Sequence, residues 1–353
     1  MRGARLDHGA VKRVRRRWGV PALGVGLVHA DGGFESLVVG DRRRGSSDLA
    51  KPDDPWHIGS CAKSMTAAVY ARLVERGDAA WGASLAELFS DLAPRVDSAW
   101  AGVTIDELFR HRAGFPANLD EAAFLAALAD SRPLEIQRTE AVARVLAAPP
   151  QALGRFRYSN LGYIAAGAAI ERILGVPFER AMVEVLLEPL GITSHGFGPP
   201  VGLWGHRGRF TLAGTGLGRG VALDPNDPTS DNPLIMAPAG CLHLTMADWS
   251  RFVRLFLVGG GVPALLSTDS VDRLLFAGEH AGAPQGMGWA PAQALDGVSF
   301  GQQGSNTAWV ATALLDGERR RAAMVLVNDG RTTMLRRTAI YAADLLRGEP
   351  VGN

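Results

Sequence analysis

Ser60 and Lys63 stand three positions apart in the segment HIGSCAKSMTA, at 57–67. Apolar residues follow Ser60 at helical spacing and predict a buried helix that ends at about Gly77, and residues three apart on a helix share one face. An amine would therefore lie beside a hydroxyl, and a serine hydroxyl attacks a carbonyl carbon only when a neighbouring base takes its proton. The alternative is structural, with Ser60 as the cap of the helix and Lys63 as a solvated side chain.

Tyr158 and Asn160 form a second polar pair in RFRYSNLGY, at 155–163. They stand where a loop leads into an apolar helix that the spacing predicts over 159–174. A phenol at this place could exchange a proton with a neighbouring hydroxyl or amine, as a general acid or base does. Taken alone, Asn160 could be the N-cap of that helix and Tyr158 a packed ring. Two such pairs in one chain favour a single site over two separate structural coincidences.

The identity of the base stays open at this stage. Lys63 is one of only three lysines in the chain, and a lysine acts as a base only where burial or a neighbour makes its neutral form accessible. Tyr158 is the other candidate. Cys61, next to Ser60, could itself be a thiol nucleophile, but no histidine stands at motif spacing, so we interpret it as a small packed residue.

The elements that position these residues are predicted at both ends of the chain. A short amphipathic helix at 6–18 precedes two strands, at 21–30 and 34–43, that flank an Asp-Gly-Gly turn as a hairpin does. Beyond residue 285 the period-two alternation returns, and a helix is predicted at about 331–346. The late strands are predicted at 286–293, 297–303, 308–316 and 321–329.

The middle of the chain is predicted to be mainly helical. Helix-like segments at 159–174, 178–188 and 246–257 are separated by Gly- and Pro-rich loops, with little period-two alternation. Strands at both ends and helices between them indicate an α+β fold. In this fold an antiparallel sheet, built from both chain ends and flanked by terminal helices, carries an inserted all-helical domain. The predicted sheet domain is discontinuous, at 1–78 and 285–353, and the helical domain occupies 79–284.

Composition argues against several classes of protein. The chain holds 37 Lys and Arg against 36 Asp and Glu, so its net charge of +1 offers no field to attract nucleic acid or an anionic membrane. Cys61 and Cys241 cannot build a disulfide framework, and no Cys/His cluster has metal-ligand spacing, so we expect neither metal nor cofactor. The glycine-rich run at 214–220 lacks the strand, helix and lysine of a phosphate-binding loop. We interpret it as a mobile loop near the mouth of the site.

Hydropathy and targeting signals bear on location. The apolar run at 161–170 falls short of the roughly 18 residues that a membrane span needs. The basic residues near the N-terminus are not followed by the cleavage site of a signal peptide. We therefore expect a soluble, cytoplasmic protein that acts on a small molecule, without a nucleic-acid or membrane partner, and the oligomeric state stays open.

The order of the motifs resembles that of serine β-lactamases and penicillin-binding proteins, in the branch of class C β-lactamases, D-alanyl-D-alanine carboxypeptidases and esterases. Ser60-x-x-Lys63 comes first, Tyr158-x-Asn160 second, and a glycine-bounded turn on a late strand third. The likeness covers roughly 15–345 and implies a sheet domain and a helical domain with the site in the cleft between them. Further phrases that carry it are LFRHRAGFP (108–116), EPLGITSHGFG (188–198), WGH (204–206) and APAGCLHLTMADWSRF (237–252).

The resemblance also implies roles for individual residues. Asn160 would orient Lys63 and bond the acyl group of the substrate. The backbone N–H groups of Ser60 and Ser305 would bind the oxyanion of the tetrahedral intermediate. His111 is expected to brace a loop. Further substrate contacts are expected from Gly304, Asn118 and His206.

The third motif departs from the family pattern. Where the family has Lys-Thr-Gly or His-x-Gly, this chain has GQQGS at 301–305, so the neutral amide of Gln302 replaces a cationic or titratable side chain. A positive charge there helps to hold a substrate carboxylate. Its absence disfavours β-lactams and D-Ala-D-Ala peptides and favours neutral esters or amides, to which Gln302 can still donate a hydrogen bond.

We therefore expect a serine hydrolase that forms an acyl-enzyme on Ser60 and cleaves an ester or amide, with weak or no β-lactamase activity. Two alternatives stay open. The same acyl-enzyme could pass its acyl group to an amine or alcohol, which would make the protein a biosynthetic acyltransferase. In the second alternative, the protein lost most of its turnover together with the cation of the third motif and now acts as a binding protein. Activity restored by Gln302→His would favour this alternative.

Overall fold

The computed structural model describes residues 6–208, 218, 220–260, 265–276 and 286–349. Most of the predicted glycine-rich loop at 214–220 lies outside these residues. The strands are β1 (Ala22–His29), β2 (Phe34–Gly40), β3 (Pro55–His57), β4 (Gly196–Phe197), β5 (His206–Arg207), β6 (Val221–Ala222), β7 (Leu242–Thr245), β8 (Ala290–Pro291), β9 (Val298–Ser305), β10 (Val310–Asp316) and β11 (Arg321–Val327). The α-helices are α1 (His8–Trp18), α2 (Ala62–Arg76), α3 (Leu85–Leu88), α4 (Ile105–Phe109), α5 (Glu121–Ala129), α6 (Leu134–Leu146), α7 (Asn160–Leu174), α8 (Phe178–Met182), α9 (Ala237–Gly240), α10 (Met246–Arg254), α11 (Thr268–Leu275) and α12 (Thr333–Arg347). Tighter turns are η1 (Gly59–Cys61), η2 (Ser90–Arg95), η3 (Ser98–Trp100), η5 (Pro228–Ser230) and η6 (Leu234–Met236), and η4 (Val183–Leu187) is a π-helical turn.

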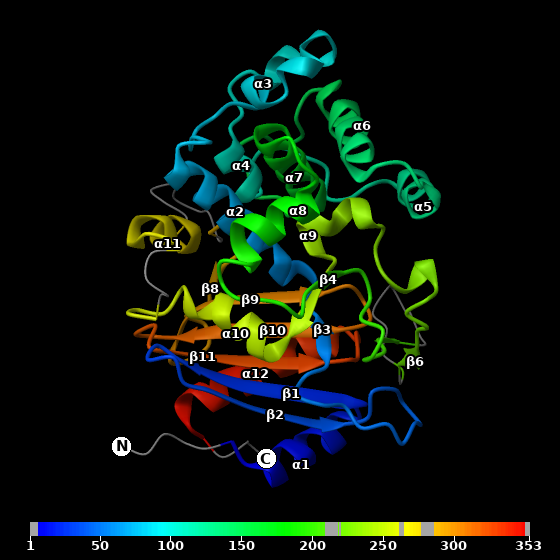
Figure 1. Ribbon diagram of the computed structural model, residues 1–353, viewed down its shortest axis with the longest axis vertical. Helices are drawn as coiled ribbons and strands as arrows, with labels where there is room; N and C mark the ends of the chain where they lie inside the picture. Colours follow the sequence, from blue (N-terminus) through cyan, green and yellow to red (C-terminus); the bar gives the residue numbers. More distant parts are fainter. Residues whose placement is uncertain (1–5, 209–217, 219, 261–264, 277–285, 350–353) are drawn as a thin grey trace.

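A six-stranded antiparallel sheet runs through the protein in the order β2-β1-β11-β10-β9-β8 (Figure 1). The early strand β1 pairs with the late strand β11, so that Val25 lies opposite Val325. On the other side of β11, β10 pairs with β9 and brings Val310 opposite Ser305. The predicted α+β fold, with a sheet built from both ends of the chain, is confirmed.

Alternate residues of β1 face opposite sides of the sheet, as the pleat of a strand requires. Leu23, Val25 and Leu27 are buried in a cluster that α1 and α12 complete. Trp18 of α1 and Tyr341 of α12 meet edge to face, with ring centroids 5.7 Å apart. The two terminal helices therefore cover one face of the sheet together.

The other face of the sheet carries the elements that reach the candidate site. Gly24 lies on this face, and a Cβ there would stand 3.2 Å from Trp56 of β3 and 3.3 Å from Met246 of α10. Because Gly24 has no side chain, β3 and α10 can pack closely on this face of the sheet. Above them α2 packs against α7, α8 and α9, within one continuous apolar core (Figure 1).

Some predicted elements differ from the observed ones. The strand predicted at 286–293 shortens to β8, because Pro291 has no N–H to donate and Gly288 has a left-handed φ of 87°. The helix predicted at 178–188 is divided into α8 and the π-helical turn η4. The middle of the chain also contains the short strands β4 to β7 beside its helices. The division into domains at 79 and 285 stays a prediction.

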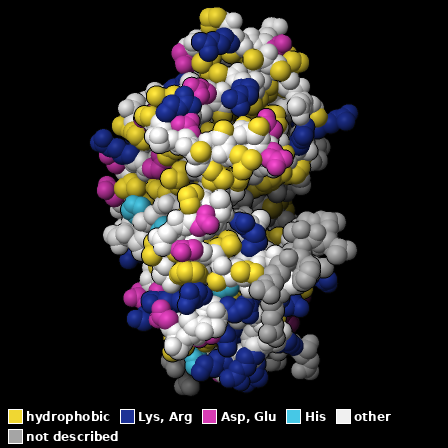
Figure 2. Space-filling view, turned by 90° about the vertical axis from the view of Figure 1, so that its right-hand side faces the viewer, with side chains coloured by type: hydrophobic (Ala, Val, Ile, Leu, Met, Phe, Trp, Pro, Cys, Tyr) yellow, Lys and Arg dark blue, Asp and Glu magenta, His cyan; other side chains and the backbone are white. Residues whose placement is uncertain are grey.

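Acidic and basic side chains are interspersed over the face shown in Figure 2, in keeping with the net charge of +1. Within the described ranges, no single helix has the length and hydropathy to cross a membrane. One pair of helices, Asn160–Leu174 and Phe178–Leu187, meets those criteria together but is bent by 81°. In the same residues, no group of three or more His, Cys, Asp or Glu side chains is placed to hold a metal ion.

Candidate active site

Ser60 lies in η1, the tight turn that leads directly into α2. Gly59 before it has a left-handed φ of 51°, which a residue without a Cβ adopts at little cost. The Ser60 side chain is partly accessible, whereas Gly59 and Cys61 are buried. The predicted helix therefore begins with a turn that presents the Ser60 hydroxyl.

The amine of Lys63 is buried in the first turn of α2 and has three oxygen partners. Lys63 is 1 % exposed, and its Nζ lies 3.1 Å from Ser60 Oγ. Nζ also donates to Asn160 Oδ1 at 2.7 Å and to the Ala239 carbonyl oxygen at 2.6 Å. A protonated amine has three N–H groups, one for each oxygen. Because the amide and carbonyl oxygens can only accept, a neutral amine would keep two N–H groups on them and turn its lone pair to Ser60.

Tyr158 brings a second titratable group to the same hydroxyl. Its OH donates to Ser60 Oγ at 2.8 Å, and 38 % of the residue is exposed. The His111 ring packs against the Tyr158 ring with centroids 4.5 Å apart, and His111 Nδ1 accepts the N–H of Ser159 at 3.0 Å. His111 therefore holds the loop that carries Tyr158.

Asn160 is the first residue of α7, and Ser159 is the N-cap, because Ser159 Oγ accepts the N–H of Gly162 at 2.9 Å. This corrects the alternative in which Asn160 caps the helix. The Asn160 side chain is free to bond elsewhere, and its Nδ2 donates to Asn118 Oδ1 at 2.6 Å. With its Nδ2 held by Asn118, the amide turns its oxygen to Lys63.

The backbone at Ser60 lies directly against β9. A Cβ at Gly304 would stand 2.6 Å from Ser60 N and 2.0 Å from the Ile58 carbonyl oxygen. A Cβ at Gly59 would stand 2.5 Å from Ser305 N. The N–H groups of Ser60 and Ser305 thus belong to two backbone segments in contact, and only glycine allows that approach. Two neighbouring peptide N–H groups are the donors from which an oxyanion hole is built.

Gln302 of β9 lines the cavity beside Ser60 and is 4 % exposed. Its Oε1 accepts from Ser64 Oγ at 2.7 Å, whereas its Nε2 is buried without a partner in the described part of the chain. The indole Nε1 of Trp289, also in the lining, is unpaired among those residues as well. A buried donor without an acceptor is costly, so the Gln302 amide favours a ligand that carries an acceptor oxygen.

Two other candidates from the sequence stand apart from the reacting groups. Cys61 is fully buried, its Sγ lies 3.7 Å from the Ala311 carbonyl oxygen, and burial raises the pKa of the thiol, so it is no accessible nucleophile. His206 is fully buried, its Nδ1 bonds the Asn328 carbonyl oxygen at 2.7 Å, and its Nε2 accepts the N–H of Arg44 at 3.0 Å. Both ring nitrogens are occupied by backbone, which corrects the expectation that His206 contacts substrate.

The side chains around Ser60 line a cavity of about 260 Å³. Among its described lining residues Lys63 and His111 are the basic side chains, and burial lowers the pKa of His111 to about 3 and keeps that ring neutral. Pro291, Leu295 and Leu314 give the cavity an apolar wall. The arrangement suits a small, mostly apolar molecule with a carbonyl group.

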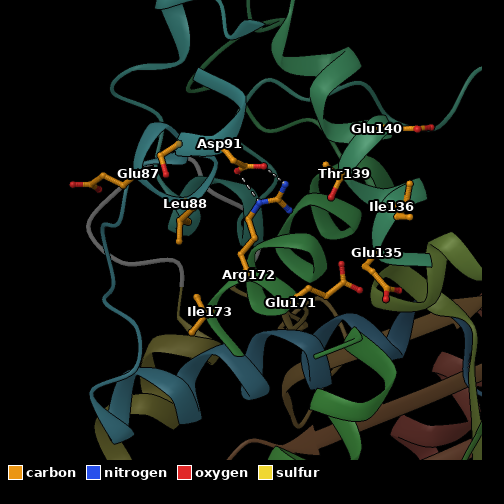
Figure 3. Close-up of a pocket in the computed structure, with 11 residues that line it drawn as sticks. Glu87, Leu88, Asp91, Glu135, Ile136, Thr139, Glu140, Glu171, Arg172 and Ile173 are labelled. Carbon is orange, nitrogen blue, oxygen red and sulfur yellow. Dashed lines mark hydrogen bonds and ion pairs between the residues drawn. The ribbon is translucent and has the colours of Figure 1, made fainter. Parts of the chain in front are cut away.

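A larger hollow of about 820 Å³ lies among α3, η2, α6 and α7 (Figure 3). Its acidic side chains are partly paired, since Asp91 accepts from Arg172 at 2.9 Å and Glu140 accepts from Arg132 at 2.9 Å. None of the groups that contact Ser60 lines it. We therefore place the candidate site in the smaller cavity.

The burial of His111 is expected to make the protein less stable in acid. Burial lowers the pKa of His111 from 6.5 to about 3, so the folded ring stays neutral while the unfolded chain takes up a proton. Its contribution to stability is therefore complete above about pH 6.5 and is lost as the pH falls toward 3, with a limiting slope of about 1.4 kcal/mol per pH unit. Urea unfolding at a series of pH values measures this slope.

A variant without the titrating ring provides the control for this effect. His111→Asn keeps an acceptor for the Ser159 N–H but does not titrate, so its free energy of unfolding should depend less steeply on pH than that of the wild type. Equal slopes in the two proteins would contradict the prediction.

Two contacts of the site were not expected from the amino-acid sequence. The Ala239 carbonyl holds Lys63, but a backbone oxygen leaves no mark in residue type. His111 was expected to brace a loop without any link to Tyr158. The segment LFRHRAGFP (108–116), which contains His111, is part of the resemblance to the family. That likeness was the signal that could have placed His111 near the site.

The family model described as Beta-lactamase matches residues 11–347 of the 353. The chain belongs to the β-lactamase family. This family consists of serine hydrolases and includes esterases and amidases beside β-lactamases. The predicted family is thus confirmed.

Individual relatives agree with the β-lactamase family. Penicillin-binding protein 4 of Amycolatopsis lactamdurans is 27 % identical over 303 residues, which are 78 % of this chain and 74 % of that one. Esterase EstB of Burkholderia gladioli is 28 % identical over 206 residues, 55 % of this chain and 51 % of that one. The crystal structure of the D-amino acid amidase from Ochrobactrum anthropi SV3 superposes with a TM-score of 0.74 at 18 % identity, covering 96 % of this chain and 98 % of that one. At that identity the likeness shows the fold alone.

Proposed function

We propose that the protein is a serine hydrolase that forms an acyl-enzyme on Ser60 and cleaves small-molecule esters or amides. The observation that carries the proposal is the pair of contacts at one hydroxyl, with Lys63 Nζ at 3.1 Å and Tyr158 OH at 2.8 Å from Ser60 Oγ. A hydroxyl between an amine and a phenol has two routes by which its proton can leave and return. Both routes stay open.

In the first step Ser60 Oγ forms a bond to the substrate carbonyl carbon, and its proton passes to the neutral amine of Lys63 or to Tyr158 in its phenolate form. The carbonyl oxygen becomes an oxyanion. When the tetrahedral intermediate collapses, the bond to the leaving alcohol or amine breaks and the leaving group takes up the same proton. Water then attacks the acyl-enzyme in the reverse sense and releases the carboxylic acid and free Ser60.

The N–H groups of Ser60 and Ser305 are the proposed oxyanion donors. Removing one such donor costs roughly 3–4 kcal/mol of transition-state stabilisation in comparable enzymes. Because both donors are backbone groups, the replacement of the usual cation by Gln302 leaves them in place. A change of substrate is therefore a better reading of this replacement than a loss of catalysis.

The lining of the cavity favours neutral substrates. Gln302 offers an unpaired N–H where a substrate carboxylate would need a cation, and the wall of Pro291, Leu295 and Leu314 is apolar. The name of one relative, an esterase, agrees with this reading. We propose neutral esters first and amides second, because an ester has the better leaving group.

Covalent labelling tests the proposal. After incubation with a fluorophosphonate, intact-mass measurement should find one adduct on the wild type and none on Ser60→Ala. Cys61→Ala is the matched control, because Cys61 is the buried neighbour and its loss should leave the adduct intact. An adduct that persists on Ser60→Ala, or its absence from the wild type, would overturn the proposal.

Steady-state assays then show whether water or another molecule, an amine or an alcohol, attacks the acyl-enzyme. In a panel of p-nitrophenyl esters, p-nitroanilides and nitrocefin, we expect Ser60-dependent release from the esters and little from nitrocefin. Adding an amine or alcohol and analysing the products separates hydrolysis from acyl transfer, since both reactions share the acyl-enzyme.

A further inference from the structure

A buried carboxylate, Asp231, connects the two backbone segments that carry the proposed oxyanion donors. Asp231 is 6 % exposed, and its two oxygens bond different side chains. Oδ2 lies 2.9 Å from His57 Nε2, and Oδ1 accepts from Asn306 Nδ2 at 2.7 Å. Oδ1 also accepts the N–H of Asn232 at 2.7 Å. His57 and Asn306 are themselves buried, at 1 % and 5 % exposed.

The His57 arm ends at the turn of the nucleophile. His57 Nδ1 accepts the N–H of Gly59 at 3.1 Å, so the ring proton is on Nε2 and points at Asp231. The ring also stacks on Trp309, with centroids 5.5 Å apart. Both nitrogens are therefore engaged, and neither contacts Ser60 Oγ. This excludes His57 as the base and makes it a support of the residue that precedes Ser60.

The Asn306 arm ends at the other donor. Asn306 directly follows Ser305, and its Oδ1 accepts the N–H groups of Ala308 and Trp309, each at 3.1 Å. This holds the turn after β9, in which Thr307 has a left-handed φ of 74°. With its oxygen engaged by the turn, the Asn306 amide can offer only its NH₂ to Asp231.

The two arms meet at one carboxylate and end one residue away from each donor. We infer that Asp231, with His57 and Asn306, sets the spacing between the N–H groups of Ser60 and Ser305 and so tunes the oxyanion hole. These three are positioning residues, because none of them touches the reacting atoms. The inference rests on the proposed function.

The direct contact of the two segments explains why such a link matters. Gly59 and Gly304 lie so close to the opposite backbone that no side chain fits between them, so a shift of one segment moves its donor relative to the other. A displacement of about 1 Å in a catalytic group can cost about 10²-fold in rate. We therefore expect changes at Asp231 to act on the transition state and to leave ground-state binding nearly unchanged.

An exchange of side chains tests the link. Asp231→Asn turns one of the two acceptor oxygens into an NH₂ group, which opposes either the Asn306 amide or the His57 Nε2–H, and Asn306→Asp places two carboxylates together. Each single variant should lower the pre-steady-state rate of Ser60 acylation by p-nitrophenyl acetate about 10- to 100-fold, with KM changed less than threefold. The double variant Asp231→Asn/Asn306→Asp restores a donor opposite an acceptor and should recover most of the loss. It should stay short of wild type, because the Asn232 N–H loses its acceptor.

A transition-state analogue gives a readout that a merely structural role would not move. Phenylboronic acid forms a tetrahedral adduct on a reactive serine, so its Kd should rise in parallel with the loss of acylation rate in the single variants and fall again in the double variant. His243→Ala is the matched control. His243 lies opposite His57 on β7 and bonds the Gly198 carbonyl at 2.7 Å, so its removal should lower Tm and leave the acylation rate within twofold of wild type.

Folded single variants that acylate at the wild-type rate would overturn the inference, as would a double variant that recovers nothing. If Asp231→Asn does not fold, Asn306→Ala replaces it, because the His57–Asp231 bond stays intact, and wild-type acylation in that variant is equally decisive against the link. If p-nitrophenolate release persists in Ser60→Ala, the proposed function fails, and the inference fails with it. A different result, in which p-nitrophenolate release depends on Ser60 but the Asp231 variants acylate at the wild-type rate, overturns the inference alone and leaves the proposed function standing.

Discussion

Replacing Lys63 by methionine is expected to lower the rate constant of Ser60 acylation by about 10³- to 10⁴-fold, the upper range for loss of a general base. Methionine fills a similar volume, but its thioether sulfur is too weak a base to take the Ser60 proton. It also leaves the oxygens of Asn160 and Ala239 without a donor, which should lower the stability as well. Single-turnover release of p-nitrophenolate measures the acylation rate, and thermal unfolding separates the loss of rate from the loss of fold.

Lys51→Met is the matched control, because Lys51 is exposed and does not line the cavity, and it should acylate as the wild type does. Tyr158→Phe separates the two routes for the proton. If Lys63→Met keeps more than a tenth of the wild-type rate while Tyr158→Phe loses about 10³-fold, the prediction is wrong and Tyr158 is the base.

Replacing Arg138 by methionine is expected to lower the free energy of unfolding by about 3–5 kcal/mol. Arg138 is fully buried on α6, where it donates to Glu171 of α7 and Glu179 of α8. It also donates to the carbonyl oxygens of Leu234 and Ile235, each at 3.1 Å. Its removal leaves the two carboxylates without a counter-charge between packed helices. Urea denaturation measures the loss.

An exposed ion pair gives the comparison for Arg138. Arg180 and Glu184 stand four residues apart with exposed side chains, so Arg180→Met should unfold at the wild-type urea concentration. Arg138→Met combined with Glu171→Gln should recover part of the stability, because the glutamine leaves no unpaired buried charge at position 171. An Arg138→Met protein as stable as the wild type would show that the buried charges are not coupled as the structure indicates.

Much of the sheet could be predicted because its strands have a clear local pattern. The alternating runs at 308–316 and 321–329 became β10 and β11 nearly as expected. The strand expected at 286–293 is observed only as the two residues of β8. The prediction rested on apolar composition and did not take into account that Pro291 has no N–H to donate to a neighbouring strand. The short strands β4 to β7 each span two to four residues, too few to show any period.

The candidate site was predictable where residue type and order carried the information. Ser60 and Lys63 meet because a helical turn joins them, and the motif order named Tyr158 and Asn160. His206 was expected to contact substrate because its phrase was familiar, although nothing in that phrase says where the ring points. The bond between His57 and Asp231 joins residues 174 positions apart, and no local pattern could have indicated it.

The pairing of β1 with β11 bears on how the protein is made. Leu27 faces Ala323 across this pair, so one edge of β1 has no strand to bond until almost three hundred further residues have left the ribosome. A nascent hairpin with an open, apolar edge can pair with other chains. We expect translation of the helical middle to be the period in which the growing polypeptide is most prone to aggregate and most dependent on chaperones.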